Sequence, residues 1–183
     1  APNLYNNSSI FILGLHASAS TVGIYAAAIK VVEAVISLGY ILSNAFLPYI
    51  SRDISRHQIF KKIMLFSGIG LTVLILILSS FIAKILFGEG NLAVAEYIQY
   101  LAISIFLVFM IQAFGNNYLM LVGSDYLVKN ISLLSSIVFF IVALLLIPVY
   151  GILGSIVTLV GARLTMALSL YLYYLKINNK LIV

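Results

Sequence analysis

The sequence has 183 residues, of which 63% are hydrophobic and only 8% are charged. Soluble domains average about 25% charged residues, so this composition excludes a soluble globular domain and predicts an integral membrane protein. The absence of cysteine excludes disulfides, thiolate metal sites and cysteine catalysis. Long unbroken apolar runs favour transmembrane helices over a barrel, which would show alternating segments of about 10 residues.

The chain begins with an apolar run, residues 4–15, that is too short to span a bilayer. We expect it to be the outer end of a helix whose beginning is absent from this sequence. Amide and hydroxyl side chains crowd its first turns, among them Asn7. Two interpretations stay open: a helix end in the headgroup region, or a helix that lines a wet cavity. A short loop is predicted at residues 16–23.

Residues 24–50 form a span that Pro48 is expected to end. Its polar residues follow one another at steps of three and four, which places them on one helix face: Lys30, Glu33, Ser37, Tyr40 and Asn44. At a rise of about 1.5 Å per residue, Glu33 lies roughly 14 Å into the span, close to the middle of a hydrocarbon core about 30 Å thick. Ionisable groups at that depth indicate function. The alternative is that Lys30 and Glu33 only neutralise each other.

Four further segments are apolar enough to span: residues 59–87, 92–122, 131–147 and 152–175. Gly115 is expected to bend the second of these, Pro148 to end the third, and Gly151 to turn the chain. The last segment has a face of small residues suited to close helix packing: Gly154, Thr158, Gly161, Thr165 and Ser169. The sequence therefore predicts an all-α transmembrane bundle of about six helices, the first truncated, in one domain over residues 1–183.

Basic residues are concentrated in alternate loops. The loops assigned to the inside hold Arg52, Arg56, Lys61, Lys62, Lys129, Lys176 and Lys180, and those assigned outside hold only Lys84. The positive-inside rule therefore places the 51–62 loop and the C-terminus in the cytoplasm. Nucleic-acid binding by this loop is disfavoured because the basic run is short and lies between two spans. His16 and His57 are expected to be solvated loop residues.

Arg163 is about 16 Å into the last span, near the midplane from either side. Its neighbours on the helix offer no partner, so the guanidinium needs a carboxylate, a carbonyl cluster or water. Glu33 is one candidate partner from another helix.

Three runs resemble a known family: VGIYAAAIK at residues 22–30, AFLPYISR at 45–52, and the opening NLYNNSSIFILG. They are similar to polysaccharide transporters of the MOP flippase superfamily, the Wzx-type O-antigen and exopolysaccharide flippases. The resemblance covers nearly the whole chain as the C-terminal six-helix lobe, although the later spans match only in hydropathy and spacing. It implies two such lobes around a typically cationic cavity. Undecaprenyl-diphosphate-linked oligosaccharide would cross this cavity by alternating access.

The resemblance supports Lys30 best as a cavity residue, and Glu33, Arg163, Asn44 and Asn7 are the other candidate substrate-binding residues. A lipid diphosphate needs cations in a low-dielectric cavity, and the lysine ammonium is a flexible point charge. The expected partners are the lipid-linked oligosaccharide, membrane lipid, the missing N-terminal lobe of the same chain, and a coupling ion, H⁺ or Na⁺. We expect no cofactor, no metal and no nucleic acid, and a multi-pass location in the bacterial cytoplasmic membrane.

Two other functions stay open. One is a cation-coupled drug or metabolite exporter of the same superfamily, with Glu33 as the ion site. The other is a membrane-embedded polysaccharide polymerase or ligase. Against an enzyme, the sequence has no serine elbow, zinc-binding helix or nucleotide loop. The Gly-rich turn at residues 88–91 lacks the Lys and Ser/Thr of a phosphate-binding loop.

Overall fold

The structure is a computed structural model that describes the backbone of residues 3–88 and 92–181 and the side chains of residues 8–88 and 93–178. This part of the chain is helical and contains no strand. Its helices are α1 (Asn3–His16), α2 (Ala19–Arg52), α3 (His57–Phe87), α4 (Leu92–Met110) and α5 (Asp125–Leu181), with a 3₁₀ turn η1 (Ile54–Arg56) and a π-helix η3 (Ile111–Leu119). Four helices are long and apolar enough to cross a membrane, as a multi-pass membrane protein requires.

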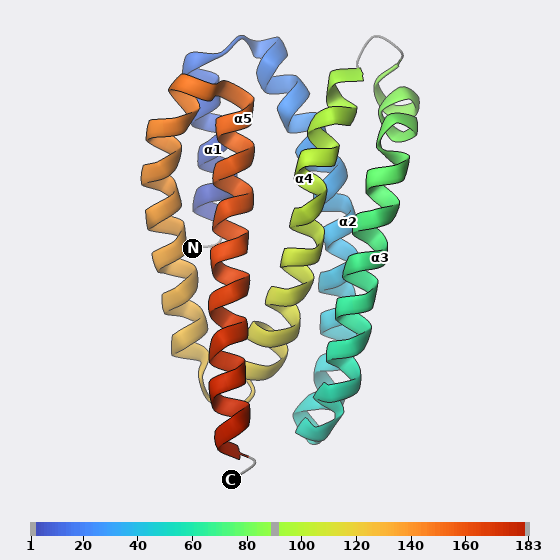
Figure 1. Cartoon of the computed structure of the whole chain (residues 1–183), viewed down its shortest axis with the longest axis vertical. Helices are drawn as coiled ribbons and strands as arrows, with labels where there is room; N and C mark the ends of the chain where they lie inside the picture. The colour runs from blue at the N-terminus through green and yellow to red at the C-terminus, as the bar shows by residue number, and fades with distance from the viewer. Residues whose placement is uncertain (1–2, 89–91, 182–183) are drawn as a thin grey trace.

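The structure corrects the predicted count of six helices, because its described residues form five α-helices. The difference lies in α5, which contains both of the last two predicted segments. At Gly151, φ is 55° and ψ is −124°, and the chain turns back there so that the two halves of α5 run side by side (Figure 1). Pro148 lies inside α5 rather than at its end. Proline removes one N–H donor, whereas the reversal needs the positive φ that glycine reaches without a Cβ clash.

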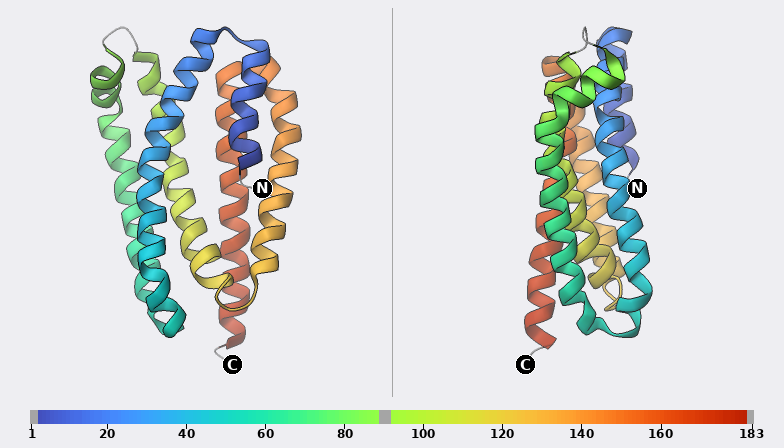
Figure 2. Two further views of the ribbon diagram at one scale, coloured as in Figure 1. Left: turned by 180° about the vertical axis from the view of Figure 1, so that it is seen from behind. Right: turned by 90° about the vertical axis from the view of Figure 1, so that its right-hand side faces the viewer.

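The bounds of α2 also differ from the prediction. The helix begins at Ala19, inside the predicted loop, because the hydroxyl of Ser18 caps it by accepting a hydrogen bond from the N–H of Thr21 at 3.3 Å. It continues through Pro48 to Arg52. One missing hydrogen bond near the C-terminal end does not stop a helix of this length. α1 and α2 lie on the same face of the molecule and meet at one end (Figure 2).

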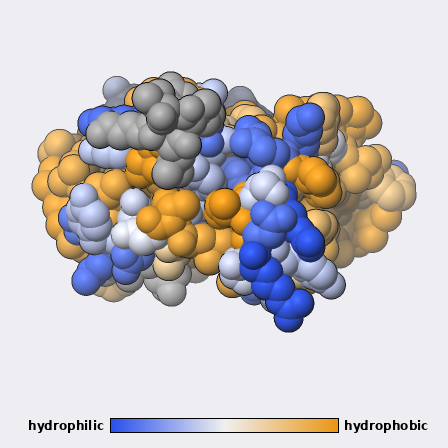
Figure 3. All heavy atoms as spheres, turned by 90° about the horizontal axis from the view of Figure 1, so that it is seen from below, coloured by the Kyte–Doolittle hydropathy of each residue, from blue (hydrophilic) through white to orange (hydrophobic). Residues whose placement is uncertain are grey.

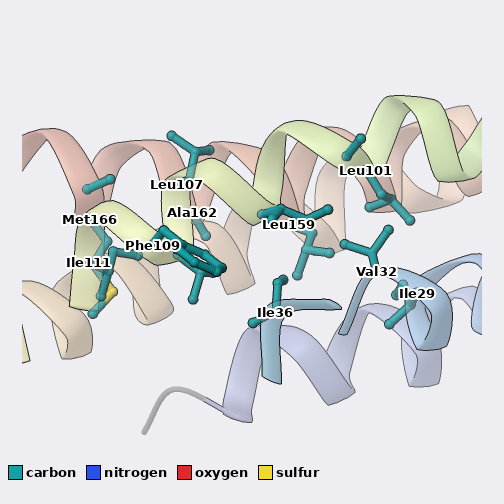
Figure 4. Close-up of a cluster of buried hydrophobic side chains, with 14 of the residues drawn as sticks. Ile29, Val32, Ile36, Leu101, Leu107, Phe109, Ile111, Leu159, Ala162 and Met166 are labelled. Atoms are coloured by element: carbon teal, nitrogen blue, oxygen red, sulfur yellow. The ribbon is translucent and has the colours of Figure 1, made fainter. Parts of the chain in front are cut away.

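α4 lies at the centre of the bundle, in contact with α2, α3 and α5. Figure 4 shows part of the buried core between these helices. Its labelled side chains are Ile29, Val32 and Ile36 from α2, Leu101, Leu107 and Phe109 from α4, Ile111 from η3, and Leu159, Ala162 and Met166 from α5. These residues give each helix one inward face, which fixes which face of α2 points outward.

Two glycines let α2 and α3 approach α4 closely. A Cβ on Gly39 would lie 2.6 Å from a ring carbon of Phe109, and a Cβ on Gly68 would lie 2.9 Å from the Cβ of Phe109. Phe109 is buried and fills the space that both glycines leave open. In lipid, helices associate through such packing, because the surrounding tails are as apolar as the side chains.

The predicted small-residue face of the last span packs within α5. A Cβ on Gly154 would lie 2.6 Å from the carbonyl oxygen of Leu146, and one on Gly161 would overlap the ring of Phe139. Both contacts join the two halves of α5. The sequence interpretation of this face as a packing surface is therefore confirmed at these two positions.

The sides of the bundle expose large apolar side chains, such as Phe66 and Ile77 on α3 and Leu145 and Val149 on α5. Viewed from the end that carries the C-terminus, hydrophilic residues gather on the end and hydrophobic residues surround it (Figure 3). This distribution suits apolar surroundings along the sides and water at the end.

Labelling of introduced cysteines tests the topology, since the chain has none of its own. Ser20 is exposed near the start of α2, and Ser55 is exposed in η1, at the other end of α2. In intact cells, we expect a membrane-impermeant maleimide to label Ser20→Cys at once and Ser55→Cys only after permeabilisation. Equal labelling of both from the same side would refute the topology, and the cysteine-free protein gives the background.

The contact between Gly39 and Phe109 makes a stability prediction. We expect Gly39→Ala to lower the free energy of unfolding by about 1–3 kcal/mol, because the buried ring cannot move aside without strain. Gly70→Ala is the matched control, since a Cβ there meets nothing within 4 Å. It is expected to be neutral or to stabilise by up to about 1 kcal/mol through helix propensity. Melting temperatures in detergent measure both, and a loss for Gly70→Ala as large as that for Gly39→Ala would contradict the packing argument.

Candidate functional site

The polar residues predicted to share one face of α2 do so. Lys30, Ser37, Tyr40 and Asn44 are exposed and Glu33 is partly buried, on a side of the helix that flanks the buried core residues. We call this set of five side chains the α2 polar face. Its middle lies where α2, if it crosses a membrane, is furthest from water on both sides. Four of its five side chains are exposed within the described part of the chain.

Lys30 and Glu33 form an ion pair on this face. The Lys30 Nζ lies 3.7 Å from the Glu33 Oε2, and the side chains are 79% and 33% exposed. This geometry is therefore consistent with the prediction that Lys30 and Glu33 neutralise each other. The distance is at the long end of ion pairing, and the exposed ammonium keeps donors that can reach a second anion.

Glu33 also belongs to a buried polar cluster with Arg163. Both interact electrostatically with Tyr25, whose hydroxyl is fully buried and lies near the side chains of Ser9 and Ser155. The Tyr25 hydroxyl makes no hydrogen bond of good geometry within the described residues. Glu33 and Arg163 thus interact with the same tyrosine, and a direct pairing between the two stays a prediction. Arg163 belongs to α5 and is only 4% exposed, so it is a buried residue rather than part of the exposed surface.

The other two candidate residues have different outcomes. Asn7 belongs to α1, but its side chain lies outside the described side chains, so its predicted place in a cavity stays a prediction. Asn44 is exposed on the α2 polar face and also lines a pocket between α2 and η3.

This pocket has a volume of about 340 Å³, and we call it the amide pocket. Its polar lining consists of one hydroxyl and four carboxamides: Ser43, Asn44, Gln112, Asn116 and Asn117. The rest of its wall is apolar and comes from Leu47, Met120 and Leu121. No charged side chain lines it.

Hydrogen bonds between α2 and η3 hold the polar wall in place. The Ser43 hydroxyl donates to Gln112 Oε1 at 3.2 Å, and Asn116 Nδ2 donates to the same oxygen at 2.7 Å. Asn117 Nδ2 donates to the carbonyl and the hydroxyl oxygens of Ser43 at 3.2 and 3.0 Å. Ser43, Gln112 and Asn117 are buried, so these bonds fix the position of η3 against α2.

The π-helix itself was not predicted. Residues of a π-turn bond five positions apart, a rare arrangement that often occurs at functional sites. The sequence analysis expected only a bend at Gly115. A Cβ on this glycine would lie 2.9 Å from Leu170, so the residue is needed for a close approach to α5.

The expectation that His57 is a solvated loop residue is wrong. The side chain is 1% exposed, and its Nε2 donates to the carbonyl of Ala113 in η3 at 2.8 Å. Its ring packs against Tyr118 and Tyr174, with centroids 4.6 and 5.5 Å away. The histidine therefore joins the start of α3 to the π-helix. Its position in a hydrophilic run gave no sign of this contact, which joins residues far apart in the sequence.

The fold and the site define the class: a helical bundle compatible with a multi-pass membrane protein, with a mostly exposed polar face on one long helix. No group of three or more potential metal ligands occurs among the described residues. Comparison with protein-family models, with curated proteins and with solved structures gives no match. The assignment of a function therefore rests on the residues themselves.

Replacement of His57 tests the link between α3 and η3. We expect His57→Phe to lower the free energy of unfolding by about 1–3 kcal/mol, because it keeps a ring but removes the buried hydrogen bond from His57 to the Ala113 carbonyl. His16→Phe is the matched control on an exposed histidine and should change it by less than about 0.5 kcal/mol. Thermal unfolding in detergent measures both. Equal effects for the two variants would show that the buried hydrogen bond contributes nothing.

Proposed function

We propose that this chain forms one half of a transporter that moves a lipid-linked oligosaccharide with an anionic diphosphate head across the bacterial cytoplasmic membrane. The observation that carries the proposal is the α2 polar face, which is mostly exposed within the described chain and begins with the exposed ammonium of Lys30.

The cost of exposing such a face to lipid supports this proposal. A lysine or a carboxylate at the centre of a transmembrane helix costs about 2.5–3.5 kcal/mol on insertion scales. Two of them on one lipid-facing surface would therefore oppose insertion. A partner surface or a water-filled path removes this cost, and a transport path between two lobes supplies both.

The chemistry of the face suits an anionic head group. Lys30 offers an ammonium with three donors, and charge-assisted hydrogen bonds to phosphate oxygens are the strong ones. Glu33 keeps that ammonium paired while no substrate is bound. A diphosphate carries more negative charge than the Glu33 carboxylate, so it can displace Glu33 from the ammonium of Lys30. The hydroxyls and the amide further along the face offer neutral donors and acceptors to a sugar.

The resemblance to Wzx-type flippases supports the same assignment, because the runs that carry it include Lys30 and the C-terminal end of α2. In that family a second six-helix lobe supplies the opposite wall of the cavity. The α2 polar face is the surface of this chain that such a lobe would meet across water.

A cation-coupled exporter is the second candidate, and one observation favours it. Glu33 is a partly buried carboxylate within a helix long enough to span, the kind of residue that forms ion sites inside a membrane. Loss of the gene separates the two functions: a flippase mutant loses surface glycan, whereas an exporter mutant becomes sensitive to drugs.

Substitution of Lys30 in the full-length protein tests the proposal. We expect Lys30→Ala to reduce glycan export about tenfold to a hundredfold at normal abundance, as loss of a charged hydrogen bond predicts. Lys30→Arg should retain part of the activity, since the charge remains but its geometry changes. Surface glycan staining measures export, and Lys129→Ala, at an exposed lysine away from the face, is the matched control.

The double variant Lys30→Ala with Glu33→Ala distinguishes substrate binding from simple neutralisation. If Lys30 only neutralises Glu33, removal of both charges restores export. If Lys30 binds the diphosphate, the double variant inserts and accumulates but stays inactive. Normal export by the double variant would refute the proposed role.

A further inference from the structure

We propose that the amide pocket is a carbohydrate subsite, which takes a neutral, hydroxyl-rich sugar of the substrate. This inference rests on the proposed function, since it names the part of a lipid-linked oligosaccharide that the pocket would hold.

The carboxamides of the pocket offer both donors and acceptors to a ligand. The network with Ser43 uses Oε1 of Gln112 and Nδ2 of Asn116 and of Asn117. Within the described part of the chain, no hydrogen bond engages the opposite atom of each group: Gln112 Nε2, Asn116 Oδ1 and Asn117 Oδ1. A sugar hydroxyl is both a donor and an acceptor, so it matches a wall that presents one amide N–H₂ beside two amide oxygens.

Asn44 adds a further carboxamide to the wall of the pocket. Its side chain is exposed and makes no hydrogen bond to another described residue, so it can serve a ligand as donor and as acceptor.

The absence of charge on the wall selects a neutral ligand. The charged ends of a lipid diphosphate would find no counter-ion among the residues that line the pocket. The apolar wall formed by Leu47, Met120 and Leu121 suits the C–H face of a pyranose ring. A volume of about 340 Å³ is at the lower end of the range for small-molecule sites, as a single sugar requires.

The pocket is continuous with the α2 polar face through Asn44. Asn44 follows Lys30 by 14 residues, or about 21 Å of helix. It lies toward the end of α2 that leads into the basic loop. A sugar held in the pocket is therefore at the predicted cytoplasmic mouth while the diphosphate is still outside the reach of Lys30. The subsite would act on entry, before the head group reaches the centre of the membrane.

Tryptophan fluorescence offers a direct test, because these 183 residues contain no tryptophan. The unaltered full-length protein gives the background for a tryptophan introduced at the rim. We expect Met120→Trp, in the full-length protein in nanodiscs, to show a saturable fluorescence change at millimolar concentration. The probe is free oligosaccharide released from the host's own surface glycan by mild acid. We also expect the oligosaccharide to raise the melting temperature of the unaltered protein. This second measurement still detects binding if the introduced indole blocks the pocket.

Rim variants connect the signal to the pocket. Asn44→Ala and Asn116→Ala are each expected to weaken binding about threefold to tenfold, as loss of one hydrogen bond predicts. Asn130→Ala, an exposed asparagine outside the pocket, is the matched control. Gln112 and Asn117 are left unchanged because they hold η3 against α2.

Three results would overturn the subsite: no saturable response in either measurement, a response that the rim variants leave unchanged, or an equal loss in Asn130→Ala. These outcomes differ from failure of the proposed function. If Lys30→Ala abolishes export but no sugar binds, the subsite is wrong and the transporter stands. If sugar binds but export does not depend on Lys30, the subsite stands and the proposed path is wrong.

Discussion

The packing of Phe109 between Gly39 and Gly68 sets the geometry on which the rest of the bundle depends. It holds α2 and α3 so close to the central helix α4 that a residue larger than glycine at either position would clash with Phe109. Because lipid does not drive apolar helices together, this fit must supply what the hydrophobic effect supplies in water. The same fit fixes the rotation of α2, and with it the direction in which Lys30 and Glu33 point.

Polar contacts also anchor α2, at two levels along the helix. Near its start, Tyr25 lies among groups from α1 and α5, including Arg163. Nearer its end, Ser43 bonds to Gln112 and Asn117 of η3. Buried polar groups of this kind are costly unless they are satisfied, so each cluster restricts how α2 can sit. Both clusters adjoin the α2 polar face, one through Glu33 and the other through Asn44, so they also hold that face in position.

Much of this could be predicted from the sequence, since it depends on local periodicity. Steps of three and four placed Lys30, Glu33 and Asn44 on one face, and Gly151 marked the turn between two apolar segments. The sequence could not supply contacts between distant positions. The bond from His57 to Ala113 spans 56 residues and that from Ser43 to Gln112 spans 69, so neither left a local signal. The helix count differed because the last two predicted segments meet at Gly151 with no separating loop, so they form the single helix α5.

The π-helix has a consequence for the amide pocket. A π-turn holds about one residue more than an α-turn, so a segment of this kind behaves as a single-residue insertion in an ordinary helix. Gln112 and Asn117 lie five positions apart, about one π-turn, so both reach Ser43. In an α-helix, residues five positions apart diverge by about 140°, so at unchanged length only one of the two would face Ser43. The polar wall of the pocket therefore depends on the π geometry of residues 111–119.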